Sequence, residues 1–340
     1  MNNPIKNLII CSTCRSEEVE WHKDKVKCRS CLNVIRIQND ICRYVETDFH
    51  SNFGFQWNKF SKVQLDSING SGESESRLFN QSKLEPKDLN GKSVLEVGCG
   101  NGRFTEILLK YGANVLAIDG SSAIDANKKN HQKYIDEAKL VLIQADLFSL
   151  PIKEHSFDFV LCYGVIQHTG DNKKAIKTLA KYPKVGGSLL LDIYSAGIRH
   201  LNPIIYLIRA IIMIKKRKTD DENLKTVIKF VNFVFPYQVK ILKILKGKSG
   251  ILKFIRYIIN RSPNSVYGIN LFLDNKITKE LAYDWSVMDT YDSWFPSFDH
   301  PVSKRKWYLY MNYIKKNYNY NIEEIGIINH GLFSVLKKLN

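Results

Sequence analysis

Long apolar runs are absent from this 340-residue chain. No apolar stretch follows Met1, so a secretory signal is not expected. The longest run, residues 203–214, contains Arg209 and falls well short of the roughly 20 residues that span a bilayer. We therefore predict a cytoplasmic protein whose seven cysteines are thiols or metal ligands rather than disulfides.

Acidic residues are scarce in one quarter of the chain. Residues 195–280 contain 17 Lys/Arg against 5 Asp/Glu, a net charge of +12 within a total of +16. Such a segment favours anionic partners, which include nucleic acid, acidic lipid headgroups and a phosphorylated carrier. The alternative is a lysine-rich composition with no functional meaning.

Four of the cysteines form two C-x-x-C pairs, Cys11 with Cys14 and Cys28 with Cys31. Each such turn directs two thiolates at one centre, and two turns complete a tetrahedral shell for Zn²⁺. Short strands are expected between the pairs, over 19–21 and 26–28. We predict a structural zinc ribbon over residues 1–45. A redox dithiol would need one pair in a thioredoxin-like context, which is absent.

From Gly91 onward, apolar strands alternate with helices, which predicts a doubly wound parallel α/β sheet. The expected strands are 93–99, 114–119, 140–145, 157–163 and 188–194, and the helices between them are 104–111, 122–137 (with a serine cap) and 172–181. The predicted divisions are the ribbon, a helical cap (46–90), a Rossmann-like cofactor-binding core (91–194), a basic helical insertion acting as a lid (195–285), and a C-terminal helix with the last two core strands (286–340). Within the insertion we expect helices over 203–214, 224–235, 239–246 and 251–260.

A dinucleotide fingerprint is missing at the first strand end. Gly98, Gly100 and Gly102 alternate there, but the third glycine of G-x-G-x-x-G is replaced by Arg103. Asp119 ends the second strand, where its carboxylate could accept both hydroxyls of a ribose. Asp146 ends the third and could accept an adenine amine. Parallel strands place these ends at one edge of the sheet, so a nucleoside site is expected.

The order Glu96-x-Gly98-x-Gly100-x-Gly102, then Asp119, then Ala145-Asp146, resembles the class I S-adenosylmethionine-dependent methyltransferases. The resemblance covers about residues 91–194 and the last two strands. It implies a seven-stranded sheet with a reversed final strand, S-adenosylmethionine as cofactor, and in-line methyl transfer. The cofactor-binding residues that it implies are Glu96, Gly98, Gly100, Gly102, Asp119, Asp146 and Leu147, to which we add Arg77 of the cap. The alternative is an α/β domain that binds NAD or no ligand.

The residues after the fourth strand are the candidates for catalysis, His168 with Tyr163. A histidine can deprotonate a hydroxyl near neutral pH. Alternatively, His168 caps the next helix or lines the cofactor pocket, because displacement at a sulfonium methyl needs positioning more than proton transfer. The Asn/Asp-Pro-Pro-aromatic and Pro-Cys motifs are missing here, which disfavours methylation of nucleic-acid bases.

A later acidic and aromatic stretch is similar to a segment of many bacterial methyltransferases that act beside surface-glycan pathways. Its candidate substrate residues are Asp289, Tyr291, Asp292 and His300. They could line a sugar pocket, or they could pack beneath the lid.

The basic insertion has three interpretations: a lid over the acceptor, an interfacial element at an anionic membrane surface, or an RNA-binding face that acts with the zinc ribbon. An rRNA guanine methyltransferase family also joins a ribbon to this fold. The insertion is richer in Ile and Phe than in Arg, which fits apolar burial better. We predict O-methylation of a sugar, glycolipid or other small hydroxyl compound, with a peripheral position at the inner membrane face as one possibility. The alternatives are a zinc-ribbon RNA methyltransferase and a non-catalytic scaffold.

Overall fold

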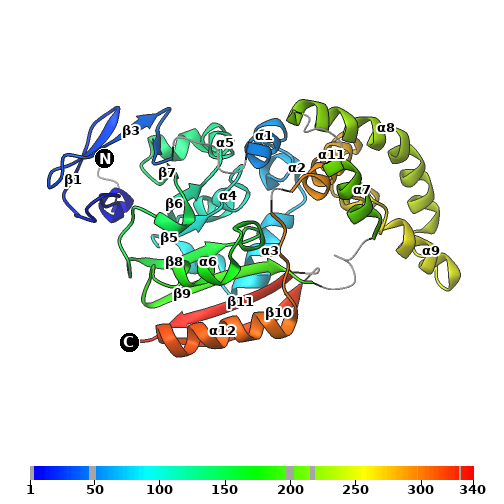
Figure 1. Ribbon diagram of the computed structural model, residues 1–340. Coiled ribbons are helices and arrows are strands. Elements are labelled where there is room, and N and C mark those ends of the chain that lie inside the picture. Colours follow the sequence, from blue (N-terminus) through cyan, green and yellow to red (C-terminus); the bar gives the residue numbers. More distant parts are fainter. Residues whose placement is uncertain (1–3, 46–50, 197–202, 215–218, 297, 329–330) are drawn as a thin grey trace.

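A computed structural model describes residues 4–45, 51–196, 203–214, 219–296, 298–328 and 331–340. One mixed sheet runs through the molecule, with the cysteine-rich segment at one end and a group of helices at the other (Figure 1). The strand order is β1-β2-β3-β4-β7-β6-β5-β8-β9-β11-β10. The core strands are β5 (Ser93–Val97), β6 (Asn114–Asp119), β7 (Leu140–Gln144), β8 (Phe157–Cys162), β9 (Pro183–Tyr194), β10 (Tyr320–Ile328) and β11 (Gly331–Lys338).

All core strands run in the same direction except β11. β7, β6, β5, β8 and β9 pair in parallel, and β11 lies antiparallel between β9 and β10. β6 and β7 are buried along nearly their whole length, as expected when helices cover both faces of a parallel sheet. The covering helices and short 3-10 turns are α4 (Arg103–Lys110), α5 (Ile124–Asp136), α6 (Asn172–Leu179), α12 (Lys304–Tyr318), η1 (Pro4–Leu8), η3 (Leu147–Ser149) and η4 (Ile166–His168).

The sheet has eleven strands among the described residues, the seven core strands and four more. The extra strands come from the cysteine-rich segment: β1 (Val19–Trp21), β2 (Lys25–Cys28), β3 (Val34–Gln38) and β4 (Ile41–Arg43). β4 pairs in parallel with β7, with Ile41 opposite Leu142. What was not predicted is this junction: β7 would otherwise be an edge strand with unpaired backbone groups, and β4 satisfies them.

Short helices precede the core and shape one side of the site: α1 (Ser51–Lys59), α2 (Asp66–Asn69), α3 (Glu73–Ser82) and η2 (Pro86–Leu89). The serine cap expected on the second core helix is not observed. α5 begins after Ala123, which makes no side-chain cap, and Ser121 instead accepts from the Ala123 backbone N–H.

A second apolar core lies in the helices that follow β9, which we call the helical unit: α7 (Pro203–Ile214), α8 (Asp220–Leu245), α9 (Ile251–Ile259), α10 (Tyr267–Leu273) and α11 (Lys279–Trp294). α8 was expected as two helices but is continuous through Pro236. An internal proline costs about 3 kcal/mol. Burial of Val231, Phe235 and Leu242 on either side of it against this core offsets that cost.

The boundary predicted between residues 285 and 286 falls inside α11, a continuous helix, so the C-terminal part of the core does not begin there. Among the described helices, none combines the length and the low charge that crossing a bilayer requires.

Candidate active site

A cavity of about 1110 Å³ opens at the carboxyl ends of β5, β6, β7 and β8. In open parallel sheets, ligands bind at this edge. The core supplies one wall, and α1, α3 and the helical unit supply the others. Ten predicted site residues line the cavity: Arg77, Gly98, Gly100, Asp119, Asp146, Leu147, Tyr163, His168, Asp289 and Asp292.

The loop after β5 is held in a conformation that favours glycine. Gly98, Gly100 and Gly102 have φ values of +76°, +51° and +89°. A Cβ on Gly100 would lie 3.4 Å from the indole nitrogen of Trp57 in α1, at the cavity wall. A Cβ on Gly98 would lie 2.2 Å from a methyl group of Val165. Side chains at these two positions would therefore fill or crowd the cavity.

Gly102 serves a different purpose, because it does not line the cavity. A Cβ there would lie 2.5 Å from Oδ1 of Asn127 and 2.6 Å from Cε1 of His131, both buried in α5. This glycine allows close packing of the loop on α5, and its contact with the cofactor stays a prediction.

Asp119 joins two of the loops that form the cavity. One carboxylate oxygen accepts from the Gly100 N–H at 2.9 Å, and the other accepts from the backbone N–H and hydroxyl of Ser121 at 2.8 and 2.7 Å. Asp146 accepts from the Phe148 N–H at 2.9 Å and caps η3, so that Leu147 is held at the rim. Both carboxylates lie where the strand pattern predicted.

Glu96 is buried beneath the glycine loop and does not reach the cavity. Its carboxyl accepts from the hydroxyl of Thr105 in α4. Burial raises its pKa from 4.5 to about 8. This position suits a residue that supports the glycine loop from beneath, because alternation along β5 turns the side chain toward α4.

Arg77 of α3 reaches the cavity as half of an ion pair. Its guanidinium donates to Asp192 at 2.5 Å, and the second oxygen of Asp192 accepts from the Gly164 N–H. The guanidinium also lies over the ring of Phe104, 5.5 Å from its centre. Asp192 was not among the predicted site residues, although an acid near the end of an apolar strand is a signal that the sequence offers.

His168 is held in one orientation at the end of η4. Its Nδ1 lies 2.6 Å from the carbonyl oxygen of Phe298. A carbonyl can only accept, so Nδ1 carries the proton and Nε2 is the basic nitrogen of the neutral ring. The rings of Phe53 and Tyr194 lie 5.0 and 5.8 Å away. The alternative of a helix cap is wrong, because Asp171 caps α6.

Unpaired polar atoms gather on the acceptor side. The Tyr163 hydroxyl is buried without a hydrogen-bond partner among the described residues, and so is one oxygen each of Asp292 and Asp299. Arg209 pairs with the other oxygen of Asp299 at 3.0 Å. Asp289 accepts from the Ser265 hydroxyl at 3.0 Å, and burial is the main cause that raises its pKa to about 7. These acceptors suit a ligand rich in hydroxyl or amino groups.

Two predicted substrate residues do not line the cavity. Tyr291 is 1% exposed, packs in the core of the helical unit, and donates to Asp220 at 2.8 Å. The helix period explains this, because Asp289 and Asp292, three residues apart, share a face of α11 that Tyr291 does not. His300 is exposed, and its backbone N–H donates to Gln167.

Residues 95–191 match the model of a family described as "Methyltransferase domain". This part of the chain is a class I methyltransferase domain. The "Ubiquinone biosynthesis O-methyltransferase" of Coxiella burnetii is 32% identical over 139 residues, which is 39% of this chain and 59% of that protein. The "tRNA U34 carboxymethyltransferase" of a Sulfurovum species is 31% identical over 112 residues, 33% of this chain and 37% of that protein.

The methyltransferase domain is thus similar to proteins whose names indicate different substrates, and the chain spans less than two thirds of their length. A magnesium protoporphyrin IX methyltransferase structure from Synechocystis, with bound SAH, aligns over 84% of each chain at 13% identity and a TM-score of 0.40. A TM-score this low supports no argument about the fold, which rests on the strand order of the sheet alone. The carboxylates of Asp289 and Asp292 lie outside the matched domain.

The four cysteine sulfurs lie close together at the far end of the sheet from the helical unit. Cys11, Cys14, Cys28 and Cys31 place their Sγ atoms within 4.8 Å of one another, with the shortest separations 3.5 and 3.6 Å. Tetrahedral Zn²⁺ with bonds of about 2.3 Å separates its sulfurs by about 3.8 Å, so this donor set fits zinc. Arg15 ties the cluster to the methyltransferase domain through the carbonyls of residues 150 and 152.

Proposed function

We propose that the protein transfers a methyl group from S-adenosylmethionine to a hydroxyl of a small acceptor, namely a sugar, a glycolipid or another metabolite. One observation carries the proposal: Asp119, His168 and the carboxylates of α11 line the same cavity. A site for a nucleoside cofactor and a site for a hydroxylated acceptor would then share one enclosed space.

The residues of the methyltransferase domain fit the cofactor. Asp119 would accept the ribose hydroxyls, Asp146 the adenine amine, and Leu147 would pack on the ring, while the bare backbone at Gly100 leaves room beside Trp57. Arg77 would meet the carboxylate end through donors that its ion pair with Asp192 leaves available. When bound, S-adenosylmethionine supplies a methyl carbon on a positively charged sulfur, which is open to displacement.

His168 would act as the base. Its Nδ1–H donates to the carbonyl of Phe298, which orients Nε2 for the acceptor. Nε2 of His168 would take the proton of the acceptor hydroxyl as that oxygen bonds the methyl carbon, while the carbon–sulfur bond breaks and its electron pair stays on the sulfur of S-adenosylhomocysteine. Asp289 and Asp292 would accept from neighbouring hydroxyls and hold the reacting oxygen in line.

A zinc ion in the cysteine cluster would be structural. Four thiolates close the coordination shell, so no position is left for a water or a substrate. Held between the two C-x-x-C turns, the metal would stabilise a ribbon too small for a core of its own. No step of the methyl transfer involves it.

RNA is the second candidate acceptor, because residues 223–262 contain nine basic residues and no acidic ones. The similarity to a protein named as a tRNA-modifying enzyme is in line with it. The exposed apolar side chains among these basic residues, however, suit phosphate contacts poorly. A scaffold that binds the cofactor without turnover is the non-enzymatic alternative.

The cofactor half of the proposal is tested by titration calorimetry with S-adenosylhomocysteine. We expect Asp119→Ala to weaken binding by at least about tenfold, because charge-assisted hydrogen bonds contribute about 1.5–3 kcal/mol each. Glu137→Ala, which removes an exposed carboxylate from the end of the neighbouring helix, is the matched control and should bind normally. No binding by the wild type, or undiminished binding by Asp119→Ala, would refute the proposed site.

The acceptor half is tested by methyl transfer to pools of hydroxylated compounds. We expect His168→Gln to lower turnover about 100-fold or more while S-adenosylhomocysteine binding is retained. Equal turnover would assign His168 to packing instead. Methylation of rRNA or tRNA fragments alone would favour the second candidate, and background hydrolysis with every pool would favour the scaffold.

A further inference from the structure

The outer surface of α8 and α9 exposes apolar side chains in ordered stripes. α9 has no buried residue along its length. Its Ile251, Phe254, Ile255 and Ile258 follow the i, i+3, i+4, i+7 pattern of one helix face and are 75%, 58%, 38% and 53% exposed. A helix of a water-soluble domain ordinarily turns such a face inward, so this one lacks a partner among the described residues.

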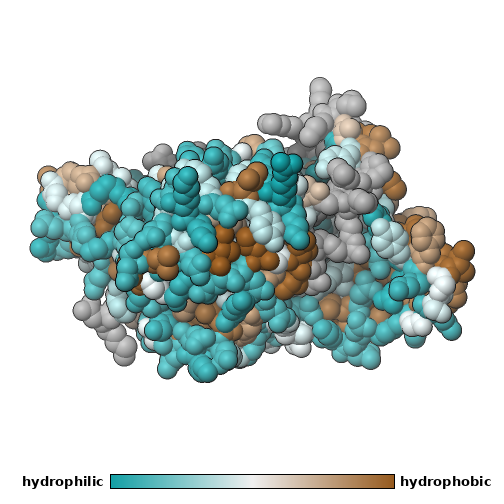
Figure 2. Space-filling model, turned by 90° about the horizontal axis from the view of Figure 1, so that it is seen from below, coloured by the Kyte–Doolittle hydropathy of each residue, from teal (hydrophilic) through white to brown (hydrophobic). Residues whose placement is uncertain are grey.

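α8 carries two apolar stripes rather than one. The stripe that includes Val231 and Leu242 is buried in the helical unit. The other includes Phe233, Tyr237 and Ile244, which are 71%, 59% and 68% exposed. Burial in the core accounts for the first stripe only. Figure 2 shows apolar side chains gathered at the end of the molecule where Figure 1 places these helices.

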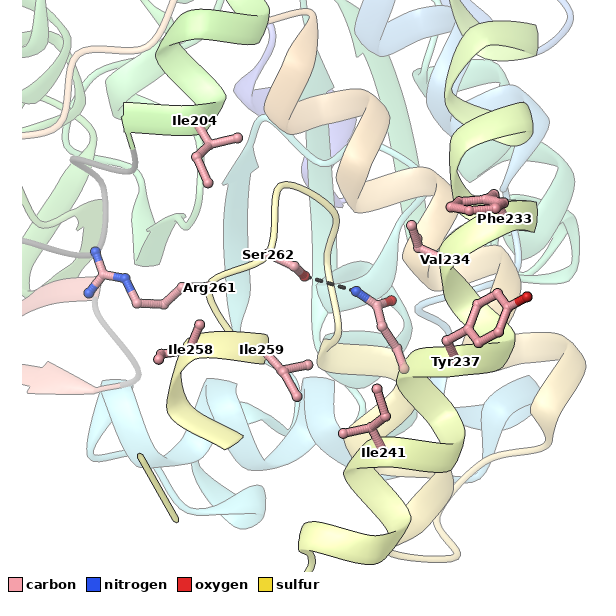
Figure 3. Close-up of a pocket in the computed structure, with 10 residues that line it drawn as sticks. Ile204, Phe233, Val234, Tyr237, Ile241, Ile258, Ile259, Arg261 and Ser262 are labelled. Carbon is pink, nitrogen blue, oxygen red and sulfur yellow. Dashed lines mark hydrogen bonds between the residues drawn. The ribbon is translucent and has the colours of Figure 1, made fainter. Parts of the chain in front are cut away.

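An apolar groove of about 670 Å³ runs between the two helices. Val234 and Ile241 of α8 face it together with Ile258 and Ile259 of α9 (Figure 3). The polar members of the lining are Gln238, Arg261 and Ser262, and Gln238 donates to the Ser262 hydroxyl at 3.0 Å. Such a lining offers contacts to hydrocarbon and few to a polar ligand.

Positive charge surrounds these stripes. The nine basic residues of 223–262 have no acidic residue among them. By the helix period, Lys229, Lys240 and Lys243 flank the exposed stripe of α8, and all three are exposed. On α9, the helix period places Lys253 and Arg256 on the side opposite the apolar face, where Arg256 donates to Oδ1 of Asn270 at 3.2 Å, so the lysines that border the surface are those of α8. Apolar side chains bordered by lysines match a bilayer interface, where hydrocarbon lies below a layer of anionic headgroups.

We propose that the surface formed by the exposed stripes of α8 and α9, with their flanking lysines, docks on a membrane leaflet that contains anionic lipids. Charge complementarity selects this occupant. A second copy of the chain would bring the same positive charge to the interface, and a nucleic acid would leave the isoleucines and phenylalanines without apolar contacts. Docking of this kind lays helices in the interface without crossing the bilayer.

The docking surface adjoins the reaction cavity. Arg261 and Ser262 line both the groove and the cavity, and Tyr257 of α9 also lines the cavity. An acceptor carried on a lipid would therefore reach the site from the membrane plane, with its chain along the groove. This last step rests on the proposed methyl transfer, whereas the docking itself does not.

The test is co-sedimentation of the full chain with vesicles of phosphatidylcholine, alone or mixed with phosphatidylglycerol. We expect binding to the mixed vesicles that weakens as salt rises, and little binding to phosphatidylcholine alone. Phe254→Glu should weaken binding about tenfold or more, because a phenylalanine contact is replaced by a charge of the same sign as the lipid. Lys243→Gln should weaken it about fivefold.

Leu309→Glu is the matched control, because Leu309 is 61% exposed on α12, away from this surface. It should bind vesicles like the wild type. Normal S-adenosylhomocysteine binding and an unchanged melting temperature will show that Phe254→Glu is folded. Equal binding of all variants, or no preference for anionic vesicles, would overturn the proposal. So would a wild-type dimer that Phe254→Glu dissociates, or salt-sensitive retention of RNA without vesicle binding. Each outcome is independent of the calorimetric test of the cofactor site.

Discussion

Gly102 and Gly100 look equivalent in the sequence, yet substitution should affect them in opposite ways. Gly102→Ala would place a methyl group 2.5 Å from Asn127 and 2.6 Å from His131. Both side chains are buried and locked by hydrogen bonds, Asn127 to Thr105 and His131 to Asn127, so neither can move without losing a partner. Gly100→Ala would meet nothing closer than Trp57 at 3.4 Å.

The magnitudes follow from these contacts. A positive φ costs a non-glycine residue about 1–2 kcal/mol at either position. Overpacking adds about 1–3 kcal/mol at Gly102 only. Gly102→Ala should therefore lower the free energy of unfolding by about 2–5 kcal/mol, or roughly 3–7 °C in melting temperature for a chain of this length, while Gly100→Ala costs about 1–2 kcal/mol.

The affinity for S-adenosylhomocysteine should fall more in Gly100→Ala than in Gly102→Ala, the reverse of the order for stability. The methyl group at Gly100 enters the cavity, so S-adenosylhomocysteine binding should fall about tenfold or more. The folded fraction of Gly102→Ala should bind nearly as the wild type does. Thermal unfolding and calorimetry on the same samples measure both quantities. A Gly102→Ala protein that melts normally but fails to bind would refute the assignment of this glycine to packing.

Two further predictions concern the metal and pH. The purified protein should contain about one zinc per chain by elemental analysis, and a zinc-free wild type would contradict this prediction. Cys14→Ser should remove the metal and lower the melting temperature. Its affinity for S-adenosylhomocysteine, measured by calorimetry, should be retained because the cluster lies outside the cavity. The free energy of unfolding should fall between about pH 5 and 8, on the order of a few kcal/mol, because the folded state holds the Glu96 proton up to a pKa of about 8 whereas the unfolded chain releases it near 4.5. Glu96→Gln keeps an acceptor for Thr105 and should flatten that slope in denaturant titrations, whereas an unchanged slope would exclude Glu96 as its source.

The edge of the sheet that lines the cavity could be predicted from local sequence patterns. An apolar strand that ends in Gly98 or Asp119 needs no distant information, because parallel strands bring successive carboxyl ends to one side of the sheet. The pairing of β1 with β2 between the cysteine pairs was expected for a similar reason: a short connection makes neighbours in sequence neighbours in space. Predictions failed where the outcome depended on distant packing. The continuity of α8 through Pro236 depends on burial against a core built from other helices.

Residue types and short spacings alone thus determined the strand ends that line the cavity, the alternation of core strands and helices along the chain, and the four-sulfur cluster. Only the tertiary structure decided that β4 extends the core sheet, that Arg77 pairs with Asp192, and that Asp289 and Asp292 reach the cavity while Tyr291 turns away. The physical reason is how far apart along the chain the interacting residues lie. Strand-end geometry follows from chain direction, whereas an ion pair across 115 residues or the rotational phase of α11 is set by which surfaces bury together.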